Sequence, residues 1–323
     1  MLMAVCHSAE KGWEEVGDLA DLSDLRVERG NLLWAEADIA NLTGADIETI
    51  AEEFGLAELA VEDAIHSRQR PKMENYEHHL FVVFHELDEI DEQLEPRQIA
   101  CFIGRREVLT LHNGADRTLG AAKRRWNQDE TELKEGPAYL LHTLMDVIVD
   151  DYQLIADRLE DEIENLEEIV LETPTAPVQK QLYNVKQRTA RLRRYVLPLR
   201  RVLEVLLDPE YGDQIPDETR ELFRDVEDHI LRIGDQVRNI DDLADAAIDL
   251  TRSAETAALN DVTKKLTGWA AIIAVPTLVS GIYGMNVGIY PHAGSRPAFW
   301  GLVAFMVVET IFLYTYFKRK GWI

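Results

Sequence analysis

Gly281-Ile282-Tyr283-Gly284-Met285-Asn286 covers the end of the first of two long apolar stretches and the three residues that follow it. That stretch, residues 266–283, contains no charged residue, and the second, residues 298–317, contains only Glu309. About 20 apolar residues in a helix are needed to cross a hydrocarbon core of roughly 30 Å. Both stretches are therefore predicted to be transmembrane helices, joined by a short extracytoplasmic loop at residues 287–297.

The charges that flank the two stretches predict their orientation. The loop has only one basic residue, Arg296. Five basic residues lie just before the first stretch or just after the second: Lys264, Lys265, Lys318, Arg319 and Lys320. The positive-inside rule then places both termini in the cytoplasm, with residues 318–323 as a basic tail. The first ten residues do not resemble a cleaved signal peptide. We expect a multi-pass protein of the cell membrane, in contact with its lipids.

Composition limits the partners of the remaining chain. The 34 lysines and arginines are outnumbered by 59 aspartates and glutamates, for a net charge of −25. Such a surface repels nucleic acid and attracts cations, so no nucleic-acid partner is expected. The charge has two interpretations, solubility or the concentration of divalent metal. No P-loop, G-x-S-x-G, HExxH or dinucleotide motif occurs, so neither an enzyme nor a nucleotide cofactor is expected.

The residues before the spans divide into three parts. Residues 1–135 are predicted to be an α+β cytoplasmic domain, a small sheet with helices, with strands at 80–84, 99–103 and 108–111 and helices at 38–55 and 56–65. Residues 136–215 are predicted to form an antiparallel helical hairpin, an acidic helix at 136–172 and a basic one at 178–207, held partly by charge. Pro198 is predicted to kink or end the second helix.

Residues 216–286 are predicted to form a very long stalk helix that continues into the first span, because no proline interrupts it before Pro276. A helix of this length usually packs against copies of itself. Two spans per chain cannot enclose a water-filled pathway, so a pore would require a symmetric ring of subunits.

Four segments then resemble one family in order along most of the chain: 70–76 (RPKMENY), 223–229 (FRDVEDH), 260–267 (NDVTKKLT) and 281–286 (GIYGMN). They resemble the CorA-type divalent-cation (magnesium/cobalt) transporters, two-span channels with a GMN motif. The resemblance implies a homopentamer whose first span lines the pore and whose second faces lipid. It also implies uptake of Mg²⁺, and of Co²⁺ or Ni²⁺, driven by the membrane potential and gated by cytoplasmic Mg²⁺.

The resemblance also assigns residues to the pathway. Gly284, Met285 and Asn286 would form the selectivity filter at the outer mouth, where neutral amide oxygens accept hydrogen bonds from the waters of hydrated Mg²⁺. Five residues would line the pore: Asn260, Thr263, Leu266, Thr277 and Gly281. Their separations of 3, 3, 11 and 4 put them on one helix face. An ordinary helix–helix contact uses the same spacing and is the alternative.

Gating by Mg²⁺ implies carboxylates that bind the regulatory metal between subunits. Asp225 matches one sensor position. Its partner is expected from the neighbouring subunit, after a strand at 80–87, with Asp88, Glu89 and Asp91 as candidates. The alternative for each is a solvated charge.

Two departures keep other functions open. The loop at 287–297 has no acidic residue, and Glu309 lies in the middle of the second span, where a carboxylate is costly and by default a functional hypothesis. Glu309 would take up a proton or an ion, or be protonated and bonded to a neighbouring helix. The first alternative is a Zn²⁺ transporter of the same superfamily, proton-coupled. The second is a membrane-anchored scaffold or sensor, for which Asn286 is dispensable.

Overall fold

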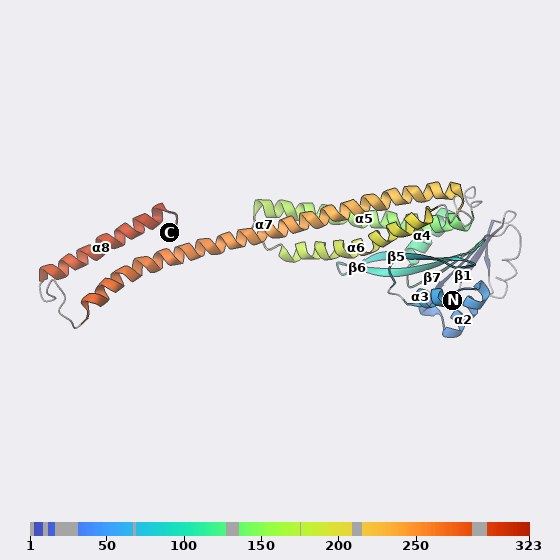
Figure 1. The fold of residues 1–323 in the computed structure, drawn as a ribbon, viewed down its shortest axis with the longest axis horizontal. Helices are drawn as coiled ribbons and strands as arrows, with labels where there is room; N and C mark the ends of the chain where they lie inside the picture. The colour runs from blue at the N-terminus through green and yellow to red at the C-terminus, as the bar shows by residue number, and fades with distance from the viewer. Residues whose placement is uncertain are drawn as a thin grey trace. The chain divides into compact units, whose positions relative to one another are not determined.

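The computed structural model describes residues 3–8, 12–16, 32–66, 69–126, 136–174, 176–208, 215–285 and 296–323. Seven strands form one sheet in the order β2-β1-β3-β7-β6-β5-β4 (Figure 1). Their bounds are β1 Met3–Ser8, β2 Gly12–Val16, β3 Leu32–Asp38, β4 Lys72–Asn75, β5 Leu80–Ile90, β6 Gln93–Ile103 and β7 Glu107–His112. Among the described strands, only β3 and β7 pair in parallel. The three predicted strands are confirmed as parts of β5, β6 and β7.

One face of the sheet is covered by α2 (Gly44–Phe54) and α3 (Glu58–Ile65). Ile50 and Phe54 of α2 pack with Phe81 and Phe102 of the sheet in one buried cluster. Local sequence sets the bounds of α2. Thr43 and Asp46 form a reciprocal capping box, and Gly55 ends the helix with φ of 62°. The helix predicted at 38–55 is therefore shorter, preceded by the 3₁₀ turn η1 (Ile39–Asn41).

The other face of the sheet packs against α4 (Asp116–Trp126) and α5 (Pro137–Glu172). Trp126 of α4 meets Trp34 of β3 edge-on with ring centroids 4.0 Å apart. The phenol of Tyr152, on α5, donates a 2.7 Å hydrogen bond to the carbonyl of His85. Both contacts are fully buried, so they fix these helices to the sheet.

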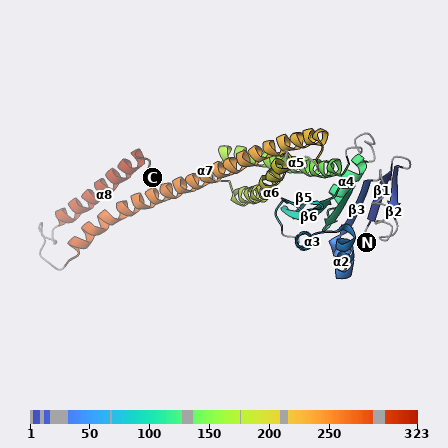
Figure 2. The same cartoon turned by 45° about the vertical axis from the view of Figure 1, so that its right-hand side comes forward.

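The predicted helical hairpin is present as α5 and α6 (Gln179–Leu206). Arg188 of α6 pairs with Glu162 of α5, but it also pairs with Glu89 of β5 at 2.9 Å. Lys186 pairs with Asp241 and Asp245, which lie on α7. Arg188 and Lys186 of α6 thus bind three elements, and Arg191 binds a fourth through Glu95 of β6. Figures 1 and 2 show α5, α6 and the beginning of α7 side by side.

Pro198 does not end α6, which continues eight residues further to Leu206. Leu199, Val202 and Leu203 are buried beyond the proline. Their packing compensates the single backbone hydrogen bond that proline removes.

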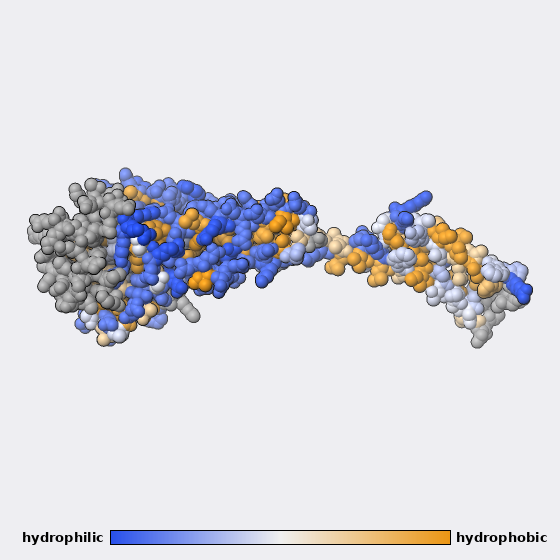
Figure 3. Space-filling view, turned by 180° about the vertical axis from the view of Figure 1, so that it is seen from behind, coloured by the Kyte–Doolittle hydropathy of each residue, from blue (hydrophilic) through white to orange (hydrophobic). Residues whose placement is uncertain are grey.

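The stalk prediction is confirmed by α7, which runs from Asp217 to Tyr283 as one helix of 67 residues. The chain divides into two compact units, residues 1–168 with 178–247, and residues 169–177 with 248–323. The second unit contains α8 (Arg296–Arg319), which lies beside the end of α7 (Figure 2). Both helices are long and apolar enough to cross a membrane. Apolar residues are frequent on the surface of α8 and the end of α7, whereas polar ones dominate the surface of the first unit's helices (Figure 3).

Candidate functional site

The end of α7 has two different faces. A stripe of less exposed residues faces α8: Gly268, Ile272, Pro276, Val279 and Tyr283. The corresponding stripe on α8 is Leu302, Met306, Glu309, Leu313 and Phe317. Spacings of three and four residues are those of a single face on each helix. The ring centroids of Trp269 and Tyr314 lie 6.4 Å apart across the pair.

All five residues predicted to line the pore lie away from this contact. Asn260, Thr263, Leu266, Thr277 and Gly281 are exposed in the chain. At about 100° per residue, their face is roughly opposite the stripe that meets α8. The hydroxyls of Thr263 and Thr277 donate to carbonyls one turn earlier, at 2.8 and 2.7 Å. Each hydroxyl oxygen keeps lone pairs, which can accept hydrogen bonds from the waters of a hydrated cation.

The turn after α7 contains two of the three predicted filter residues. The Gly284 N–H donates to the Ser280 carbonyl at 2.9 Å, and the Met285 N–H donates to the Ile282 carbonyl at 3.3 Å. A Cβ on Gly284 would lie 3.2 Å from the Ser280 oxygen, closer than ordinary contact. Asn286 lies outside the described residues, as does most of the loop that follows it.

The predicted sensor residue Asp225 lies on α7 in the first unit. Its side chain is 72% exposed, and its carboxylate is 4.0 Å from the ring of His229, one turn along the helix. Exposure of this degree leaves the carboxylate available to another molecule.

The three predicted partners of Asp225 have different surroundings. Strand β5 continues to Ile90, so the prediction that it ends at residue 87 is wrong, and Asp88 and Glu89 lie within it. Asp88 is within 3.2 Å of Arg97 and 3.6 Å of Arg117.

Glu89 is paired with Arg158 and Arg188. Asp91 is exposed at the turn between β5 and β6, with φ of 50°. Among the described residues of one chain, the structure groups none of the three with Asp225 as metal ligands.

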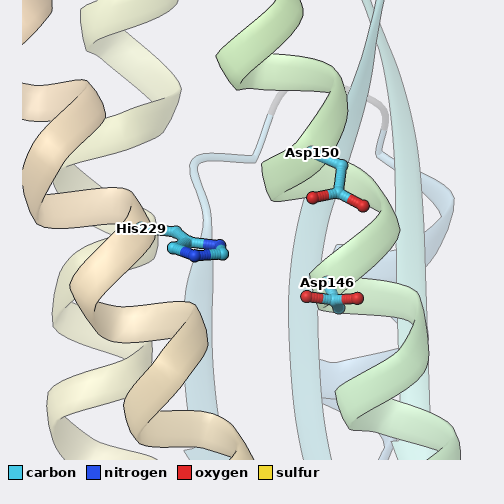
Figure 4. Close-up of side chains that lie close together, drawn as sticks. All are labelled: Asp146, Asp150 and His229. Atoms are coloured by element: carbon cyan, nitrogen blue, oxygen red, sulfur yellow. The ribbon is translucent and has the colours of Figure 1, made fainter.

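A different cluster does meet the spacing of metal ligands. Asp146 and Asp150 project from consecutive turns of α5, and His229 projects toward them from α7 (Figure 4). One ligand atom from each lies within 4.8 Å of the others. The motif FRDVEDH contains His229, but only the packing of α5 against α7 brings the two aspartates to it. Sequence patterns therefore did not indicate this cluster.

Arg125 of α4 already forms ion pairs with both aspartates. Its guanidinium pairs with Asp146 and donates to Asp150 at 2.7 Å. Burial opposes the charge of Arg125, but the bonds to Asp150 and the attraction of Asp146 outweigh it and raise its pKa. In this arrangement the cluster is an ion-pair network, with the imidazole at its edge.

Glu309 lies on the α8 stripe that faces α7. Its Oε2 is buried and has no hydrogen-bond partner among the described residues. Its carboxyl group therefore faces the contact between the two spans, on the side of α7 opposite the predicted pore residues.

Comparisons with known proteins agree with this architecture. A family described as "CorA-like Mg2+ transporter protein" matches residues 30–319. The Cobalt/magnesium transport protein CorA of Thermotoga maritima is 32% identical over 293 residues, which are 88% of this chain and 82% of that protein.

Two solved structures share the fold. The complete structure of the CorA magnesium transporter from Methanocaldococcus jannaschii gives a TM-score of 0.83 at 22% identity, covering 99% of both chains. The structure of the full-length CmaX protein gives a TM-score of 0.78 at 18% identity, covering 98% of this chain and 97% of that one.

Proposed function

Because the chain belongs to the CorA-like Mg²⁺ transporter family, we propose that it forms a homo-oligomeric channel, a homopentamer, for uptake of Mg²⁺, and of Co²⁺ or Ni²⁺. The face of α7 with Asn260, Thr263, Leu266, Thr277 and Gly281 lines the pathway, and α8 faces lipid. The observation that carries this proposal is the exposure of that face on the side of α7 opposite α8. A ring of α7 helices around an axis covers it.

The chemistry of this face suits a hydrated ion. Mg²⁺ loses its waters reluctantly, and neutral hydroxyl and amide oxygens accept hydrogen bonds from those waters. Conduction requires several weak sites rather than one tight one. An inward potential supplies about 2.3 kcal/mol per charge per 100 mV, roughly double for a divalent ion, so no nucleotide is required.

We further propose that cytoplasmic Mg²⁺ closes the channel by binding Asp225 together with carboxylates of a neighbouring subunit. Of the three candidates, Asp88 and Glu89 are each engaged by two arginines. A metal ion reaches the exposed Asp91 with less competition. Both termini lie in the cytoplasm in this proposal.

Flux into liposomes tests the proposal. Potential-driven Mg²⁺ uptake is expected for the wild type and is lost in Asn286→Ala, with Asn165→Ala, outside the spans, as the matched control. Unchanged uptake in Asn286→Ala contradicts the filter assignment. If neither Mg²⁺ nor Zn²⁺ uptake depends on Asn286, the scaffold or sensor alternative holds.

Gating has its own test. Asp225→Ala is expected to raise the internal Mg²⁺ concentration that half-inhibits uptake by on the order of tenfold, which corresponds to about 1.4 kcal/mol. Asp242→Ala, an exposed carboxylate farther along α7 and on a different face, serves as the control. Equal inhibition of all three proteins contradicts a sensor role for Asp225.

The Zn²⁺ alternative is supported by one observation, the imidazole of His229 beside two carboxylates, since imidazole suits Zn²⁺ better than Mg²⁺. Zn²⁺ uptake that follows an imposed pH gradient, with little Mg²⁺ uptake, is the result that favours it.

A further inference from the structure

The buried carboxyl of Glu309 requires a hydrogen-bond partner, and the side chains around it are mostly apolar. Residues 266–283 of α7 contain no charged residue, and Glu309 is the one charge in 298–317. Among the described residues of the two facing stripes, the only other titratable side chain is the phenol of Tyr283. An unpaired carboxyl group at this depth is costly, so a hydrogen-bond partner on the facing helix is expected.

The register of the two helices locates Glu309 against α7. Trp269 lies beside Tyr314, and a Cβ on Gly268 would be 3.8 Å from the Phe317 ring. The two helices run antiparallel, so residues earlier in α8 lie beside residues later in α7. Glu309 precedes Tyr314 by five residues and Phe317 by eight, which places it beside residues 274–276 of α7.

Pro276 lies at this level, on the stripe of α7 that faces α8. Proline has no N–H, so the carbonyl of Ile272, four residues earlier, loses its donor within the helix. Ile272 is buried on the same stripe, 6% exposed. Helix carbonyls point toward the C-terminal end, so this oxygen points toward the level of Pro276. Within a bilayer no water replaces the donor, and a neighbouring helix commonly does.

We propose that the protonated carboxyl of Glu309 donates a hydrogen bond to the main-chain carbonyl of Ile272. One orphaned donor on α8 and one orphaned acceptor on α7 then satisfy each other. Glu309 is in this view a positioning residue, which supports the interruption at Pro276 in the helix that carries the pore face. The inference rests on the membrane placement of α7 and α8 in the proposed function, not on the identity of the ion.

The same geometry separates this role from ion coupling. A carboxyl that passes protons or metal ions must reach the pathway, whereas Glu309 faces the side of α7 opposite Thr277 and Gly281. The inference therefore predicts that a group with a neutral donor can replace it.

Infrared spectroscopy of the full-length protein in liposomes tests the protonation state. A carboxylic-acid C=O band is expected at neutral pH that is absent in Glu309→Gln. Absence of any such band that depends on Glu309 overturns the proposal. This measurement needs no transport, so it is decided even if the protein conducts no ion.

Thermal unfolding and flux test the hydrogen bond. Glu309→Gln retains a neutral donor and should match the wild type, whereas Glu309→Leu should lower the melting temperature by a few degrees and reduce flux. Pro276→Ala returns an N–H donor to Ile272, so Glu309→Leu should then have little effect. Three results would overturn the proposal. Glu309→Gln and Glu309→Leu could lower the melting temperature and flux equally, or Glu309→Leu could have the same effect with and without Pro276. The third is flux that follows a pH gradient only when Glu309 is present.

Discussion

At the scale of single residues, Arg125 decides what the cluster of Asp146, Asp150 and His229 does. Arg125→Gln removes the cation that pairs with the partly buried Asp146 and the exposed Asp150 beside an imidazole. Because partly exposed ion pairs contribute about 0.2–1 kcal/mol each, the melting temperature in metal-free buffer should fall by a few degrees. Added Co²⁺ should restore it, because Asp and His are suitable ligands for Co²⁺.

The control for this prediction combines Arg125→Gln with His229→Gln, in which Co²⁺ should restore much less. Equal recovery in the two variants would mean that Co²⁺ acts elsewhere in the protein. Thermal unfolding followed by circular dichroism measures both.

His85 sets a limit on stability in acid. Burial, and secondarily the charge of Arg194, lowers its pKa from 6.5 to about 4. The unfolded chain therefore binds more protons than the folded one between these values, so stability falls as pH drops from 6.5 toward 4. The shift corresponds to about 3 kcal/mol. Burial raises the pKa of the neighbouring Glu86, which opposes this trend, because that group stabilises the fold at lower pH.

Denaturant unfolding at pH 7 and pH 4.5 measures this effect. His85→Gln, which cannot gain a proton, should show a smaller loss between the two pH values than the wild type. An identical loss in both proteins would assign the acid sensitivity to other groups, such as the buried His79 and His112, whose pKa values burial also lowers.

From the sequence, the placement of single residues could be predicted where a motif or a helical periodicity marks them. The helical spacing of Asn260 through Gly281 was enough to place five side chains on one face. The sequence did not predict the ion pairs of Asp88 and Glu89, because their four arginine partners come from four other elements. The Asp146 cluster and the seam position of Glu309 also depend on which helix packs against which.

At the scale of elements, the contact of α8 with α7 depends on a small residue. A Cβ at Gly268 would approach Cγ1 of Ile323 to 3.2 Å, so the chain end after α8 packs directly on this glycine. Gly321, with φ of 69°, turns the chain there, and Trp322 stacks on Phe317. Gly268→Leu should therefore displace the chain end and lower the melting temperature, whereas Gly268→Ala should have a small effect.

Removal of Trp322 and Ile323 provides the control. If the contact is direct, Gly268→Leu should cost less in the shortened chain than in the full one. Equal costs in both would mean that the leucine acts on a different neighbour.

Helix limits were predicted well where proline or glycine marks them and poorly where packing overrides propensity. Gly136-Pro137 and the residues 173–177 delimit α5, and the absence of proline before Pro276 matches the length of α7. Pro198 is the opposite case, because buried leucines beyond it hold α6 together. Strand β5 extends beyond the apolar run at residues 80–84 because β6 continues to pair with it up to Ile90.

At the scale of the whole molecule, the hairpin of α7 and α8 has a face that no other described part of the chain covers. Leu266, 70% exposed, lies on the predicted pore face, and Ile311, 57% exposed, lies on the side of α8 away from α7. In a ring with α7 inside, copies of Leu266 approach one another, whereas copies of Ile311 face lipid. Oxidation of Leu266→Cys in liposomes should therefore give disulfide-linked dimers, and Ile311→Cys should remain monomeric on a denaturing gel.

The native thiols do not confuse this measurement, because Cys6 and Cys101 are both buried and burial raises the pKa of Cys101. Thiolate is the species that forms disulfides, so neither should react at neutral pH. A disulfide joins only two cysteines, so each Leu266→Cys chain contributes one bond and the principal product is a dimer from within the ring. Efficient cross-linking at Ile311 but not at Leu266 would place α8, and not α7, at the centre of the assembly and contradict the proposed pathway.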